Sequence, residues 1–229
     1  MHSRRQVLSG LGAAGLTALA GCLGGGGDGG GSPAVANAPI PANPGEYTYA
    51  RTGTAGPTIT YYGNWKCPFC AEFSNGSDRV LNLGTIVTEY VEPGALQLRF
   101  RALAYTSSGQ PFLGPDAVRA ARAGLAVWNL APAQYWRYHE RIMAEQPPES
   151  ETWATTDRLV QFAETAGVEA TEELRTAIES GEYQSAVRES AQRASTLGVD
   201  GTPYLVIDGS LYSPFRPSAT RSALETLTA

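Results

Sequence analysis

The feature that most constrains this fold is the segment Lys66-Cys67-Pro68-Phe69-Cys70, in which two cysteines are separated by two residues. An apolar, β-branched run precedes the segment and a helix-like run follows it, so the cysteines are expected where a strand gives way to a helix. Pro68 suits the first turn of a helix, because its missing N–H would have no partner there. Two thiols so placed can form and break a disulfide with each other, without any cofactor.

Strand-like segments flank a long helical middle. The expected elements are an edge strand at Tyr47–Tyr49, a strand at 58–62, a helix from Pro68 to about Tyr90 with a bend near Asn75-Gly76, a strand at 95–101, a helical block at about 112–198, strands at 204–207 and near Leu211, and a helix at 217–227. Asp208-Gly209 between two apolar runs predicts a hairpin. Strand, helix and strand in succession predict a parallel pair, and the hairpin adds antiparallel strands, which together indicate an α/β fold.

Two separate motifs carry a family resemblance. The segments Tyr62–Cys70 and Gly201–Gly209 lie about 130 residues apart and resemble the two signature regions of DsbA-type disulfide oxidoreductases. The resemblance implies a thioredoxin-like fold, βαβ…ββα, over residues 46–229, with the helical block inserted between its halves. It also implies that Pro203 is cis and lies against the active-site disulfide, and that Thr202 offers backbone hydrogen bonds to substrate. A trans turn is the alternative for Gly-Thr-Pro considered alone.

The two cysteines are assigned different roles. Cys67 is predicted to be the nucleophile, because a helix start and the adjacent Lys66 both favour a thiolate. Cys70 lies one turn into the helix and is predicted to be the less exposed, resolving thiol. Half of a zinc site is an alternative, but such a site needs four ligands and His139 is the only histidine beyond the first few residues, so no metal is predicted. An inert structural disulfide is the other alternative.

Residues next to the motifs are assigned supporting roles. The predicted active-site support consists of Lys66, Pro68, Phe69, Thr202 and Pro203, and the predicted substrate-binding residues are Trp65 and Tyr204. An apolar rim that includes Phe69 would hold unfolded substrate chains.

One position departs from the family pattern. Many relatives carry a buried carboxylate six residues before the nucleophile, where it helps to move a proton, and this chain has Tyr61 there. Glu72 or water is then expected to take the proton, unless that step is less assisted. His139 lies on an apolar helical stripe and is interpreted as a packed histidine.

The N-terminal residues resemble an export signal. Arg4-Arg5 precede an apolar stretch, Val7–Ala20, that is too short to span a bilayer, and Leu19-Ala20-Gly21-Cys22 resembles a lipobox. A short buried helix with an incidental cysteine is the alternative. The predicted organisation is a signal peptide at 1–21, a lipidated Cys22 with a glycine- and proline-rich linker at 22–45, and one domain at 46–229.

Composition and motifs together predict the function. The net charge of −5 and the lack of a basic stripe argue against nucleic-acid binding. The expected protein is a monomeric, lipid-anchored oxidoreductase on the outer face of the cytoplasmic membrane that donates disulfides to reduced or unfolded secreted proteins. The resemblance implies a membrane quinone-linked thiol oxidase as its redox partner. The alternatives are an extracytoplasmic reductase or isomerase of the same fold, and a non-catalytic binding lipoprotein.

Overall fold

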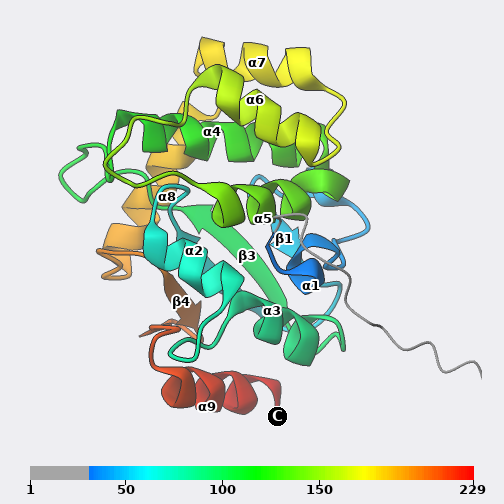
Figure 1. Ribbon diagram of the computed structural model, residues 1–229. Coiled ribbons are helices and arrows are strands. Elements are labelled where there is room, and N and C mark those ends of the chain that lie inside the picture. Colours follow the sequence, from blue (N-terminus) through cyan, green and yellow to red (C-terminus); the bar gives the residue numbers. More distant parts are fainter. Residues whose placement is uncertain (1–30) are drawn as a thin grey trace, which may run out of the picture.

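A computed structural model describes residues 31–229, and five strands in it form one mixed sheet (Figure 1). The strands are β1 (Arg51–Thr52), β2 (Thr58–Gly63), β3 (Gln97–Ala102), β4 (Tyr204–Ile207) and β5 (Ser210–Tyr212), in the spatial order β1-β3-β2-β4-β5. β2 and β3 are parallel, and all other neighbours are antiparallel. The predicted parallel pair and the closing antiparallel hairpin are both confirmed.

β2 is a central strand and carries the chain to the cysteines. It pairs with β3 from Thr58 opposite Gln97 to Gly63 opposite Ala102, and its other edge pairs with β4. β2 has neighbours on both edges, and its residues from Ile59 to Gly63 are all buried, which agrees with the apolar and aromatic run in this segment. The sheet therefore fixes the position at which the chain leaves it, just before the cysteines.

The turn between β4 and β5 has the predicted conformation. Asp208 and Gly209 have φ values of 46° and 75°, and two successive positive φ values define the type I′ turn that Asp-Gly favours. β4 is thereby held between β2 and β5, with its first residue next to the second sequence motif.

The helix that follows the cysteines is shorter than predicted. α2 spans Pro68–Asn75 and ends at Gly76, whose φ of 87° is readily adopted only by glycine. Helical structure resumes in α3 (Leu83–Ile86), where the Asn82 side chain accepts a hydrogen bond from the Thr85 N–H, and continues as the π-helical segment η2 (Val87–Val91). The expected bend near Asn75-Gly76 is thus a complete break.

A helical layer lies between β3 and β4 in the chain. Its elements are α4 (Pro115–Leu130), the short 3₁₀ segment η3 (Pro132–Gln134), α5 (Tyr135–Glu145), α6 (Thr156–Thr165), α7 (Thr171–Ser180) and α8 (Gln184–Thr196). α4 packs against α5, α6 and α7, α5 also packs on α2, and α8 packs on β3 (Figure 1). The final helix, α9 (Pro217–Thr228), packs on β4 at the opposite end of the molecule from α6 and α7. None of the described helices has the length and apolar character needed to cross a membrane.

The linker predicted to end at residue 45 is too long. Residues 33–36 form the short helix α1 (Pro33–Ala36), which packs against α3 and α5, and Val35 is fully buried. A second short segment, η1 (Pro44–Glu46), follows it. The glycine and proline content suggested a linker, but apolar side chains within this segment, such as Val35, are buried in the core. Cys22 and the predicted signal peptide lie outside the described residues.

The edge strand is also displaced from its predicted position. Tyr47–Tyr49 precedes β1, which pairs with β3 at Arg51 and Thr52. The Tyr49 hydroxyl instead donates to the Ala186 carbonyl at 2.9 Å, so this tyrosine connects the N-terminal segment to α8.

Candidate active site

The cysteines lie where β2 gives way to α2. Cys67 is the N-cap of the helix, with extended backbone, and Pro68 occupies the first helical position as predicted. The N–H groups of Cys70 and Ala71 donate to the Cys67 carbonyl at 3.0 and 3.1 Å, which closes the first turn. Cys67 is 4% exposed and Cys70 is fully buried, so the thiols differ in accessibility as expected.

The two thiols also differ in acidity. A hydrogen bond from the Cys70 thiol lowers the pKa of Cys67 from 9.0 to about 6, and burial only partly opposes it. Thr202 and the backbone N–H groups of the helix start also contribute to this lowering, and the value of about 6 includes them. Burial, followed by the neighbouring Cys67, raises the pKa of Cys70 well above its ordinary range. At neutral pH the pair therefore consists of one thiolate and one thiol, which is the state needed for nucleophilic attack by Cys67.

The second sequence motif meets the first at the sulfur atoms. The Thr202–Pro203 peptide bond is cis, as predicted. The Cys67 thiol lies 3.4 Å from the Thr202 carbonyl oxygen, although the two residues are 135 positions apart. The Thr202 side chain favours the ionised form of both cysteines. The loop therefore contributes backbone and side-chain polar groups to the site.

A family model described as Thioredoxin matches residues 52–226 of this chain. The chain belongs to the thioredoxin family. Among curated relatives, the probable disulfide bond formation protein D of Bacillus anthracis is 27% identical over 157 residues, 68% of this chain and 67% of the relative. Disulfide bond formation protein D of Bacillus subtilis is 21% identical over 158 residues, 69% of this chain and 66% of the relative.

Solved structures show the same fold. The oxidised crystal structure of BdbD from Bacillus subtilis matches with a TM-score of 0.65 at 21% identity, over 83% of this chain and 98% of that one. Chlamydia trachomatis DsbA matches with a TM-score of 0.63 at 21% identity, over 79% and 93% of the two chains. The predicted thioredoxin-like fold class is confirmed, and the chain is a disulfide oxidoreductase.

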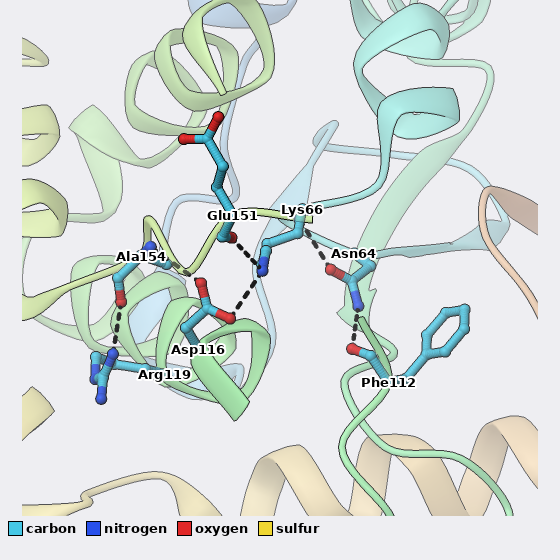
Figure 2. A network of polar contacts seen from close by, with 7 residues as sticks. All are labelled: Asn64, Lys66, Phe112, Asp116, Arg119, Glu151 and Ala154. Atoms are coloured by element: carbon cyan, nitrogen blue, oxygen red, sulfur yellow. Dashed lines mark hydrogen bonds and ion pairs between the residues drawn. The ribbon is translucent and has the colours of Figure 1, made fainter. Parts of the chain in front are cut away.

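Lys66 does not act on the thiolate of this thioredoxin-family protein as predicted. Its side chain is buried, and its ammonium group lies 2.8 Å from the Asp116 carboxylate and 2.8 Å from the Glu151 carbonyl oxygen (Figure 2). The other Asp116 oxygen accepts from the Ala154 N–H at 3.2 Å. Lys66 therefore holds the loop that carries Cys67 against α4 and the segment before α6.

Asn64 is a site residue that the sequence reasoning missed. Its side-chain oxygen accepts from the Lys66 N–H at 2.9 Å, and its amide donates to the carbonyls of Leu103 and Phe112 at 2.9 and 3.2 Å (Figure 2). Its backbone N–H lies 3.4 Å from the Cys70 sulfur. A single buried asparagine after a strand has no distinguishing pattern, so these contacts could be found only in three dimensions.

Trp65 is not a substrate-binding residue. It is 1% exposed, and its ring packs against Phe100 at 5.4 Å and Tyr138 at 5.5 Å between ring centroids. α4 approaches this indole so closely that a Cβ on Gly124 would lie 2.4 Å from it. Trp65 is therefore a core residue that joins the active-site loop to the helical layer.

Phe69 gives the active-site segment an exposed apolar side chain, and Phe215 packs against it. Phe69 is 51% exposed and meets Phe215 edge to face, with ring centroids 5.8 Å apart. Tyr204 is half-buried at the start of β4. Phe215, in the loop before α9, was not predicted, because only the fold brings it beside Phe69.

Glu72, the expected proton acceptor, is a weak base in this structure. Hydrogen bonds from Arg79 and Ser77 lower the pKa of Glu72 to about 2, so it stays ionised and paired at neutral pH. Two other carboxylates, Asp116 on α4 and Glu140 on α5, are buried among the described residues, and the sequence did not indicate their burial. Among residues 31–229, no group of three or more histidine, cysteine or acidic side chains is arranged to hold a metal ion.

Proposed function

We propose that this protein donates disulfides to exported proteins through the Cys67–Cys70 pair. A substrate thiolate attacks the Cys67 sulfur, a mixed disulfide forms, and the sulfur of Cys70 leaves and takes up a proton. A second substrate thiolate then attacks the substrate sulfur of the mixed disulfide and releases Cys67 as a thiolate. The substrate gains one disulfide, and the cysteine pair is left reduced.

The observation that carries this proposal is the lowered pKa of Cys67. A stabilised thiolate is a good leaving group and stabilises the reduced form of the enzyme, which favours transfer of its disulfide to other proteins. The value of about 6 lies between the values of about 7 for thioredoxin and about 3.5 for DsbA. This order supports a pair that is more oxidising than thioredoxin.

The surroundings of the sulfurs support an extended or unfolded substrate. The Thr202 carbonyl is beside Cys67 and offers a backbone hydrogen bond to a chain lying along the Pro203 loop. Phe69, two residues after Cys67, packs against Phe215 and provides an exposed apolar side chain in the active-site segment. A substrate cysteine must therefore be flanked by free backbone hydrogen-bonding groups and an accessible apolar side chain, and an unfolded chain offers both more readily than a folded protein.

The N-terminal sequence supports the proposed location, and the family resemblance supports the proposed redox partner. The paired arginines, the apolar stretch and Cys22 support export, cleavage and lipid anchoring at the outer face of the cytoplasmic membrane. The protein acts there as a monomer, and a membrane quinone-linked thiol oxidase returns the cysteine pair to its disulfide form. Replacing Cys22 by serine would release the protein from the membrane fraction if this anchor exists.

The direct test follows disulfide transfer to a reduced, unfolded test protein. Wild-type protein with an oxidised Cys67–Cys70 pair should restore activity to the test protein, and Cys67→Ser should abolish transfer. Cys70→Ser, incubated with the test protein in its disulfide form, should accumulate a mixed disulfide that is visible as a covalent complex on a non-reducing gel, because the Cys67 thiolate opens the disulfide and no second thiol releases it. Unchanged transfer by Cys67→Ser would refute the function.

Reductase activity is the second candidate, because a Cys67 pKa of about 6 is closer to that of thioredoxin than to that of DsbA. Trapping thiols in intact cells separates the two directions. A mostly oxidised cysteine pair supports disulfide donation, whereas a mostly reduced pair assigns the protein to the reductases. Equilibration with a glutathione series then gives the reduction potential.

A further inference from the structure

The Cys70 thiol needs a route for its proton. When Cys70 attacks a mixed disulfide on Cys67 it must lose a proton, and when it leaves as a sulfur anion it must gain one. Cys70 is fully buried, and burial raises its pKa, so bulk water is a poor partner for this exchange. Glu72 is already committed to Arg79. The acceptor must therefore be sought among the buried groups around the sulfur.

The Tyr61 hydroxyl is the first such group. Tyr61 is fully buried on β2, and its hydroxyl lies at the end of the strand, where a Cβ on Gly63 would come within 2.7 Å of it. The next residue, Asn64, has its N–H 3.4 Å from the Cys70 sulfur. The hydroxyl is thereby placed beside Cys70, and the thiol raises the pKa of Tyr61. It makes no hydrogen bond of good geometry with the described residues.

A buried histidine–carboxylate pair lies behind this tyrosine. The His139 Nδ1 atom is 2.8 Å from the Glu140 carboxylate, and both residues are at most 1% exposed. The same carboxylate accepts from the Ser74 hydroxyl at 2.5 Å and from the Ser32 N–H at 2.6 Å. The carboxylate thus has three hydrogen-bonding neighbours, and an Nδ1–H donated to it leaves the lone pair of His139 on Nε2.

The Nε2 atom of His139 has no partner among the described residues. The imidazole is enclosed by aromatic rings, with centroids 5.3 Å from Trp65, 5.3 Å from Phe100, 5.4 Å from Trp136 and 6.2 Å from Tyr61. Of these four rings, only Tyr61 carries a hydroxyl. The Nε2 acceptor of His139 and the hydroxyl donor of Tyr61 are therefore both buried without a partner in the same aromatic surroundings near Cys70. Burying unpaired polar groups costs folding free energy, so such groups call for an explanation, and a catalytic role is one.

We propose that the His139–Glu140 pair exchanges the proton of Cys70 through the Tyr61 hydroxyl. The Tyr61 hydroxyl and Nε2 of His139 are not hydrogen-bonded to each other in the structure, and the step requires them to come within hydrogen-bond distance when Cys70 reacts. The S–H proton of Cys70 then moves to the Tyr61 oxygen while the Tyr61 proton moves to Nε2 of His139. The products are a Cys70 thiolate and an imidazolium that is stabilised by the Glu140 carboxylate. When Cys70 is the leaving group the same two transfers run backwards. No oxidant or reductant enters the step, and the inference depends on the roles proposed above for Cys67 and Cys70.

Few other ionisable groups surround this path in the described part of the chain. From α2 they are the two cysteines, from β2 Tyr61, and from α5 Glu140 and the two buried phenols of Tyr135 and Tyr138. Burial raises the pKa of both phenols well above neutrality, so neither changes charge in the working range. Loss of the relay should therefore be visible as a change in the pH profile of one step.

The test uses the reaction of the reduced protein with the aromatic disulfide of thionitrobenzoate in a stopped-flow instrument. Attack by Cys67 releases the first coloured thiolate, and attack by Cys70 on the mixed disulfide releases the second. We expect Tyr61→Phe and His139→Gln to slow the second phase by about a hundredfold at neutral pH, at the lower end of general acid–base effects. The first phase should stay within about twofold of wild type. The deficit should shrink as pH rises, because hydroxide replaces the relay.

Tyr138→Phe is the matched control. Tyr138 is fully buried and its hydroxyl is also without a partner, but Cys70 does not influence its pKa. The proposal is overturned if Tyr61→Phe or His139→Gln reacts in the second phase within about twofold of Tyr138→Phe. It is also overturned by a deficit that is constant across pH, which indicates a purely structural effect. Absence of the first phase in wild-type protein would instead refute the proposed function.

Discussion

The lowered pKa of Cys67 makes the stability of the reduced protein depend on pH. The folded value of about 6 lies below the ordinary value of 9.0. A group of this kind contributes stability that is fully present above the unfolded pKa and lost as pH falls through the folded pKa. Cys70 adds little below pH 8, because its thiol stays protonated in both the folded and the unfolded chain there.

The expected size follows from the difference between the two pKa values. Each pH unit between them contributes about 1.4 kcal/mol, so the free energy of unfolding should rise by about 2 kcal/mol between pH 6 and pH 8 on account of Cys67 alone. Cys67 is almost completely buried, so little of this is lost to solvent screening. The oxidised protein has no titrating thiol at the site and should lack the increase.

Urea unfolding under reducing conditions measures this quantity. Reduced wild-type protein and Cys67→Ser are unfolded at pH 6, 7 and 8, and the difference in their unfolding free energies removes the contribution of every other group. Ultraviolet absorbance of the thiolate gives the Cys67 pKa independently. A difference that changes by less than about 0.5 kcal/mol over this range, within the error of urea extrapolation, would refute the reasoning.

Three further changes test single contacts. Thr202→Val should raise the Cys67 pKa by less than about one unit, because the Thr202 hydroxyl favours the thiolate without making a hydrogen bond of full strength; the pH dependence of alkylation measures this. Asp116→Asn should lower the unfolding free energy by about 3 to 5 kcal/mol, because it leaves the buried Lys66 charge without its carboxylate, and urea titration would show it. Phe69→Ala should raise KM for a reduced, unfolded protein several-fold without changing the rate with a small aromatic disulfide; equal effects on both would contradict a substrate contact.

The parts of the fold that follow local patterns could be predicted from the sequence. Alternating and β-branched residues placed β2, β3 and β4, and Asp208-Gly209 placed the hairpin, because strand and turn preferences act over a few residues. The resemblance of two motifs supplied the contact between Cys67 and the cis Pro203 loop, which no local pattern contains.

The parts that failed depend on contacts between distant segments. Trp65 and Lys66 lie in a loop without periodicity, so the sequence does not indicate that one enters the core and the other reaches Asp116. Val35 lies in a proline-rich segment that looked like a linker, yet it is buried against the helices. In each case the partner is far along the chain, and only the folded structure selects it.

The Lys66 ammonium group, which joins the active-site loop to α4 and to the segment before α6, limits the movement of that loop. With Lys66 held at both Asp116 and Glu151, the sulfur next to it has little freedom to swing toward an incoming chain. All the adjustment needed to align three sulfur atoms in a row must then come from the incoming polypeptide. We therefore expect the enzyme to react with its substrate proteins before they fold, while their backbones are still flexible.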